Sequence, residues 1–261
     1  MRKLLMLTVA LCATMALAAV GFASAAGEGP VSVRVGNIEV TADGGFTPTA
    51  LSKKTLEPIA LNVEGKIKTL DGTHPPAVKE VIIEGDKNAV VDSKGIPTCS
   101  SGQLQSRDTK AAEAACGPAI IGTGKTTVEV QFPEQNPIMV NSKLLLINGG
   151  SSGGTTTWYV HAYFNAPITG AIVTTVKIKN KANGRYGTLS VASIPKIAGG
   201  AGSVRSFQLT VDKNVKGAGG KTYHPITAKC TDGKLQVHAE AKFDDGTKAA
   251  TEVIRACTPK G

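Results

Sequence analysis

The sequence predicts an all-β protein: a mainly antiparallel β-sandwich, with a jelly roll as one candidate arrangement, carrying one short helix near residues 108–116. Three observations support this prediction. Apolar and polar residues alternate in many short runs, which is typical of half-buried strands. Asp-Gly and Asn-Gly pairs separate these runs, and such pairs favour tight hairpin turns. A single alanine-rich segment interrupts the pattern.

The first segment has the features of a secretory signal peptide. Met1-Arg2-Lys3 is a short basic start, residues 4–22 are almost wholly apolar, and Ala23-Ser24-Ala25 offers small residues for cleavage. We predict cleavage near Ala25 and a mature chain, residues 26–261, that is secreted and either extracellular or associated with the cell surface. Loss of Arg2 and Lys3 lowers the net charge from +9 to +7.

The expected strands follow one another along the mature chain. They cover residues 31–35, 59–63, 127–132, 157–164, 168–178, 206–211 and 235–243. Turns are expected at residues 43–45, 71–72, 148–150, 183–184, 232–233 and 245–246, where Asp or Asn precedes Gly.

The glycine-rich stretch 149–154 leaves two domain organisations open. It can be a long hairpin loop inside one β-sandwich domain of residues 26–261, or a flexible linker between two β domains, 30–148 and 155–261. Strand patterns come close to this stretch on both sides, which favours the loop.

The helix is expected where alanine, the strongest helix former, is concentrated. Residues 108–116 read Asp-Thr-Lys-Ala-Ala-Glu-Ala-Ala-Cys. Asp108 or Ser106 can cap the start, and Gly117-Pro118 ends it. Two turns of helix are marginal alone in water, so this helix needs a tether.

Four cysteines remain after Cys12 leaves with the leader, and they predict two disulfides. An even number in an exported chain allows three connectivities, of which we favour Cys99–Cys116 and Cys230–Cys257, the neighbours in sequence. A zinc site needs closer Cys or His spacings than any in this chain. We therefore predict no metal.

The basic excess limits the expected partners. The basic excess of an exported protein is consistent with binding to an anionic wall polymer, a glycan or a membrane surface, but we favour the simpler interpretation that the charge serves solubility alone. Lys177, Lys179 and Lys181 alternate along an expected strand. Clustered basic residues interleaved with aromatic residues are lacking, so we predict no nucleic-acid binding. Residues 119–126 match a permissive phosphate-binding loop, but a helix precedes them and a strand follows, so we predict no nucleotide and no other cofactor.

One strand carries the candidate binding face. Trp158, Val160, Ala162 and Phe164 are expected to face the core, which leaves Tyr159, His161 and Tyr163 pointing outward. Such an aromatic and polar face could bind sugars. The alternative is ordinary cross-strand pairing on a sheet surface.

The sequence contains no complete catalytic set, so we predict no catalytic residues. The leading hypothesis is an exported, non-catalytic structural or binding protein of the cell surface or extracellular space. A secreted polysaccharide-active hydrolase is one alternative, for which Glu129 and His161 are the first residues to test. A small-ligand carrier is another.

Several phrases together resemble a known group of proteins: residues 71–76, 95–99, 114–117 and 194–200, and the strands around Cys230 and Cys257. The chain is similar there to exported, uncharacterised proteins of high-GC Gram-positive bacteria. That resemblance implies a secreted β-rich domain with paired cysteines, and it implies no activity or ligand.

Overall fold

The computed structural model describes residues 29–261, so the predicted signal peptide lies outside the described residues. The all-β, mainly antiparallel prediction is confirmed. Twelve strands form one sheet in which every neighbouring pair is antiparallel. Across the sheet they run β1 (Val31–Val35), β2 (Ile38–Thr47), β5 (Ala60–Thr69), β13 (Gly202–Val211), β8 (Ile120–Val130), β9 (Ile138–Ser152), β10 (Thr155–Phe164), β11 (Gly170–Asn183), β12 (Tyr186–Ser193), β6 (Val78–Asp86), β17 (Lys234–Phe243) and β18 (Lys248–Ala256).

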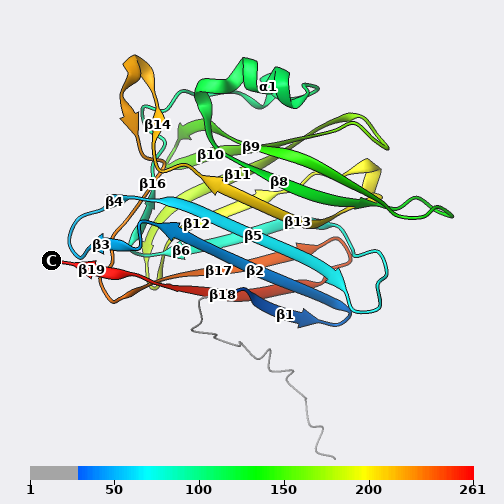
Figure 1. Ribbon diagram of the computed structural model, residues 1–261, viewed down its shortest axis with the longest axis horizontal. Coiled ribbons are helices and arrows are strands. Elements are labelled where there is room, and N and C mark those ends of the chain that lie inside the picture. The colour runs from blue at the N-terminus through cyan, green and yellow to red at the C-terminus, as the bar shows by residue number, and fades with distance from the viewer. Residues whose placement is uncertain (1–28) are drawn as a thin grey trace, which may run out of the picture.

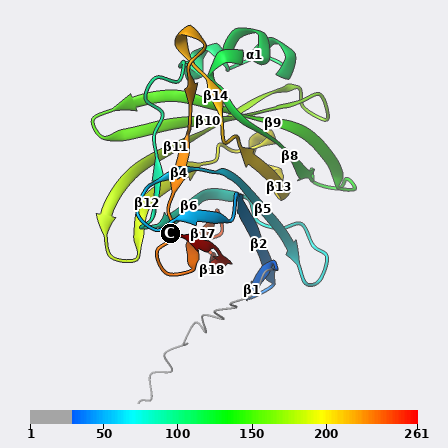
Figure 2. The ribbon, with the colours of Figure 1, turned by 60° about the vertical axis from the view of Figure 1, so that its left-hand side comes forward.

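The sheet curls until its two edges meet. β1 at one edge contacts β18 at the other, so the sheet almost closes (Figures 1 and 2). Ile38 and Ile67 of β2 and β5 pack in one buried cluster with Phe243 and Ala249 of β17 and β18. The two layers expected of a sandwich are therefore opposite parts of one curved sheet.

Arg255 of β18 spans the seam between these edges. Its Nε donates to the Gly44 carbonyl at 2.6 Å and its Nη2 donates to the Gly29 carbonyl at 3.1 Å. The guanidinium also forms an ion pair with Asp43. One side chain thus links β18 to β2 and to the residues just before β1.

Long connections cross both ends of the sheet. Residues 70–77 join β5 to β6 and residues 194–201 join β12 to β13, and in each case the two strands are far apart in the sheet order. These two connections lie at the same end, because the Ile194 amide donates to the Lys79 carbonyl at 2.9 Å. Residues 87–119 and 212–233 cross the other end.

Smaller sheets fill that second end. They pair β4 (Glu57–Pro58), β16 (Ile226–Ala228) and β7 (Ala89–Val91), β14 (Val215–Lys216) with β15 (Thr222–Tyr223), and β3 (Ala50–Ser52) in parallel with β19 (Thr258–Lys260). The main core lies beneath them and combines Phe46, Leu146, Trp158, Val211 and Leu235 with residues of the crossing segments.

The predicted helix is confirmed as α1 (Thr109–Cys116). Asp108 caps it, since its Oδ1 accepts from the Ala111 amide at 2.7 Å. Both favoured disulfides are present, with Cα–Cα distances of 5.7 Å for Cys99–Cys116 and 6.0 Å for Cys230–Cys257. Short 3-10 turns occur at η1 (Ser101–Gln103), η2 (Gly117–Ala119), η3 (Ala198–Gly200) and η4 (Ala218–Gly220).

Two of the expected turns are wrong. Residues 43–45 continue β2, where Gly44 lets two strands approach closely: a Cβ there would lie 2.8 Å from the Asn62 carbonyl oxygen. Residues 148–150 continue β9, and the turn comes later, at Gly153 and Gly154, both with positive φ. The Gly-rich stretch thus ends in a hairpin turn between β9 and β10.

Candidate functional site

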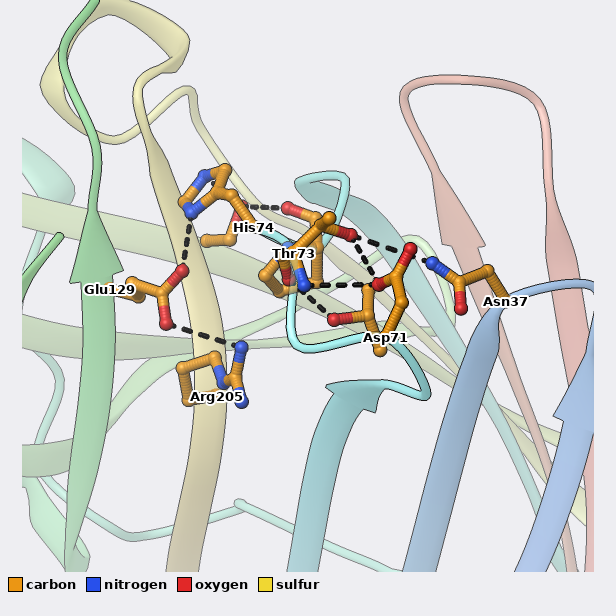
Figure 3. Close-up of polar contacts among 9 residues, drawn as sticks. Asn37, Asp71, Thr73, His74, Glu129 and Arg205 are labelled. Carbon is orange, nitrogen blue, oxygen red and sulfur yellow. Dashed lines mark hydrogen bonds and ion pairs between the residues drawn. The ribbon is translucent and has the colours of Figure 1, made fainter. Parts of the chain in front are cut away.

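A network of polar side chains lies where residues 70–77 pass the ends of β8 and β13 (Figure 3). His74 comes from the crossing connection, Glu129 from β8, and Ser203 and Arg205 from β13. His74 Nδ1 is 2.7 Å from Glu129 Oε1, and Arg205 Nη1 is 3.2 Å from Glu129 Oε2. On the other side of the imidazole, Ser203 Oγ is 3.1 Å from His74 Nε2.

The pairing of β8 with β13 explains how three of these residues meet. Ser203 and Glu129 are directly opposite in the β13–β8 ladder, which places them on the same face of the sheet. The register of that ladder shifts between Val204 and Ser206, and Arg205 at this irregularity reaches Glu129. The two strands therefore supply three of the four groups.

The fourth group, His74, is positioned by a hydrogen-bonded turn. Asp71 Oδ1 accepts from the Thr73 amide at 3.0 Å and from the Thr73 hydroxyl at 2.7 Å. Hydrogen bonds from Asn37, from the Thr73 hydroxyl and from the Thr73 amide lower the pKa of Asp71 to about 2. Pro75 and Pro76 follow His74 and restrict the backbone beyond it.

In this network a serine contacts a histidine, which in turn contacts a carboxylate, and acyl-transfer enzymes use the same sequence of contacts. In those enzymes the serine hydroxyl donates to the imidazole and is open to substrate. Here Ser203 is only 1% exposed, and its hydroxyl donates to the Pro75 carbonyl at 2.6 Å. The network consequently fastens residues 70–77 onto β8 and β13, and its serine is covered.

Sequence reasoning found only part of this network. The sequence offers Glu129 as a candidate for the hydrolase alternative, but nothing in it links Glu129 to His74 or Ser203. Ser203 is 129 residues from His74 in the chain, and Glu129 is 55 residues from it. The pairing of β8 with β13 brings Ser203 and Glu129 together, and the crossing connection 70–77 brings His74 to them. No short motif encodes either contact.

The predicted binding face is covered by another part of the chain. His161 lies on the face of β10 opposite Trp158, as expected, but it is fully buried, and Tyr159 and Tyr163 are half-buried, so the expectation that this face is open to solvent is wrong. The reason is a cover of residues 99–119, held by the Cys99–Cys116 disulfide. Residues of this cover and of β9 together form a second core beneath α1. This core contains Leu104, Ala112, Leu145 and Ile147, and Tyr159 packs against it.

His161 is held by that cover. Its Nε2 donates to the Arg107 carbonyl at 3.0 Å, and its Nδ1 has no hydrogen-bond partner among the residues described. Burial lowers the pKa of His161. One signal in the sequence could have revealed the cover: residues 144–147 are apolar at four successive positions, which is typical of a strand buried on both faces.

The three lysines of β11 are exposed. Lys177, Lys179 and Lys181 alternate along the strand on one face of the sheet, as predicted, and none of them takes part in an ion pair among the described residues. We call these three residues the β11 lysine row. By contrast, Lys242 of β17 is neutralised by an ion pair with Glu80 of β6, at 2.7 Å.

One apolar pocket lies at the end crossed by residues 194–201. Its volume is about 70 Å³, and its lining includes Val130, Phe164, Ile168 and Ile197. Small-molecule sites usually occupy about 300 Å³ or more. The pocket is therefore too small to hold a typical small-molecule ligand, and it does not support the small-ligand carrier hypothesis.

Within residues 29–261, no group of three or more His, Cys, Asp or Glu side chains is arranged to hold a metal ion. No helix of this described part has both the length and the apolar character needed to cross a bilayer. Comparison of the chain with protein-family models, with curated proteins and with solved structures gave no match.

Proposed function

We propose that the protein is an exported, non-catalytic structural or binding protein of the cell surface or extracellular space. One observation supports this proposal: the Ser203–His74–Glu129 network resembles a catalytic arrangement, but it serves to hold residues 70–77 against β8 and β13. Both Glu129 oxygens are engaged, and the Ser203 hydroxyl is buried against the Pro75 carbonyl. Two disulfides, which persist in oxidising compartments, support export.

The test combines a binding and a labelling measurement on the purified mature chain, residues 26–261. We expect the protein to sediment with isolated Gram-positive cell walls and to resist labelling by a fluorophosphonate probe, which reacts with activated serines. A protein that stays in the supernatant of every wall preparation, or that carries the probe on Ser203, would contradict the proposal.

A second candidate, a secreted hydrolase acting on polysaccharide or its ester groups, is favoured by the spacing of Ser203, His74 and Glu129. It requires residues 70–77 to move so that Ser203 becomes accessible. A panel of glycoside and ester substrates tests it with the native protein and Ser203→Ala. Turnover that disappears in Ser203→Ala would establish this candidate, and equal background rates would remove it.

A further inference from the structure

We propose that the β11 lysine row binds a linear polyanion of the cell wall. This inference rests on the proposed function and names the chemistry of its ligand. Alternate residues of a regular strand are about 6.6 Å apart, which is the spacing along β11 of Lys177 and Lys179; Lys181 follows them beyond Asn180, where the ladder with β12 shifts register. A polymer with phosphate or carboxylate groups repeating at a similar interval matches the row in charge and geometry.

The neighbouring strands do not neutralise the row. Lys177 is opposite Thr157 on β10 and Val191 on β12, and Lys179 is opposite Leu189 on β12. All three neighbours are uncharged. Lys177 and Lys179 therefore face solvent without an acidic residue at these ladder positions.

The acidic residue in line with Lys179 across the sheet is Glu84, which lies one strand beyond β12. Glu84 of β6 is opposite Leu189, two strand spacings from Lys179, which is about 10 Å. Salt screens charges over roughly the same distance. Glu84 also has its own partner, since its carboxylate is 3.3 Å from His238 Nδ1.

A polymer fits this row better than a membrane surface. Binding to a bilayer usually joins basic residues to apolar side chains that insert between the lipids. The exposed large hydrophobic residues described are Leu56, Leu70, Ile138, Met139 and Ile168, and none of them belongs to β11. The row is narrow and polar, which suits an extended chain lying along it.

The experiment compares three forms of the mature protein: native, Lys177→Gln/Lys179→Gln/Lys181→Gln, and a control, Lys53→Gln/Lys54→Gln/Lys94→Gln. The control loses the same charge from three exposed lysines that lie outside β11 and form no ion pair among the described residues. Binding is measured by biolayer interferometry on immobilised long-chain polyphosphate, on polygalacturonate and on vesicles that contain phosphatidylglycerol. Thermal unfolding checks that all three forms fold.

We expect the β11 variant to lose about tenfold or more in affinity for at least one polymer, and the control to lose little. The slope of log affinity against log salt should fall by about 2 in the β11 variant, since three charge contacts are removed. Equal losses in both variants, or binding to vesicles alone, would overturn the inference. If the native protein and the β11 variant sediment equally with cell walls, the inference fails and the proposed function stands. If neither sediments, the proposed function fails.

Discussion

Three polar side chains, of which His161 and Asn148 are buried and Arg255 is partly buried, each hold a part of the chain that lacks regular pairing. Arg255 links β18 to carbonyls across the seam, and His161 donates to the carbonyl of Arg107 beneath the helical cover. Asn148 donates to the carbonyls of Ile96 and Pro97, both at 3.1 Å. Hydrogen bonds of this kind stabilise modestly when made but cost more when a buried partner is left unsatisfied.

The first prediction concerns Arg255. Arg255→Lys keeps the charge but loses the planar guanidinium that reaches several acceptors at once. We expect the free energy of unfolding to fall by about 2 kcal/mol, because carbonyls at the seam lose a charged donor. Urea unfolding at neutral pH measures this. Arg34→Lys is the matched control: its side chain is 69% exposed, and Lys68 also pairs with Glu39 at 2.8 Å, so little stability should be lost.

The second prediction concerns His161 and pH. Because burial lowers its pKa in the folded state, the unfolded chain binds a proton that the folded chain rejects. Its contribution to stability is therefore complete above about pH 6.5, the usual histidine value, and is lost as the pH falls below it. Urea unfolding from pH 8 to pH 5 should show a steeper loss for the native protein than for His161→Gln. Parallel curves would contradict this assignment.

Residue-level errors of the sequence reading have a common physical cause. Alternation shows that His161 and Trp158 occupy opposite faces of β10, but it does not show which face is covered. That depends on residues 99–119, which fold over the sheet from outside it. The polar network was missed for the same reason, since His74 and Ser203 meet only through tertiary structure.

At the scale of elements, the segment of residues 99–119 is a cover built from α1, two short turns and one disulfide. It turns part of the outer face of β9 and β10 into a second core. Local sequence predicted α1 well, because alanine content, an Asp cap and a Gly-Pro end all act within the helix itself. The turns at residues 43–45 and 148–150 were wrong because glycine also serves close approach between strands, and buried Asn148 holds a neighbouring segment.

The third prediction tests this cover. Cys99→Ala/Cys116→Ala should lower the free energy of unfolding by about 3 kcal/mol, the value expected for a loop of this length. Hydrogen exchange at the amides of α1 should also become much faster, since a helix of eight residues is marginal without its tether. Cys230→Ala/Cys257→Ala is the comparison: a similar loss of stability with slow exchange in α1 is expected. Unchanged exchange in the first variant would contradict the tethering role.

At the scale of the whole molecule, strands from both halves of the chain alternate in one sheet. β13 lies between β5 and β8, and β6 lies between β12 and β17. This strand order predicts that the chain unfolds as one cooperative unit and not as two domains divided at the Gly-rich stretch. Alternation predicted seven of the twelve strands of this sheet and their antiparallel character. It did not predict the strand order, because long crossing connections leave little trace in local sequence.

The fourth prediction uses Trp158, the single tryptophan of the chain, as a probe of that unit. Trp158 is buried in the main core, and its Nε1 donates to Ser93 Oγ at 2.8 Å. Its fluorescence and the far-ultraviolet circular dichroism should therefore change at the same urea concentration. Two separate transitions would instead favour domains of residues 30–148 and 155–261.

The seam between β1 and β18 has a topological consequence. The first and last strands of the sheet are neighbours. The two ends of the chain can therefore be joined by a linker, and new ends can be made at another loop, without changing which strands pair. A circular permutant with a flexible linker of about fifteen residues between Gly261 and Gly29, and new ends at Gly153 and Gly154, should fold and give the native circular-dichroism spectrum. Aggregation of that permutant would show that the seam must be formed by two free ends.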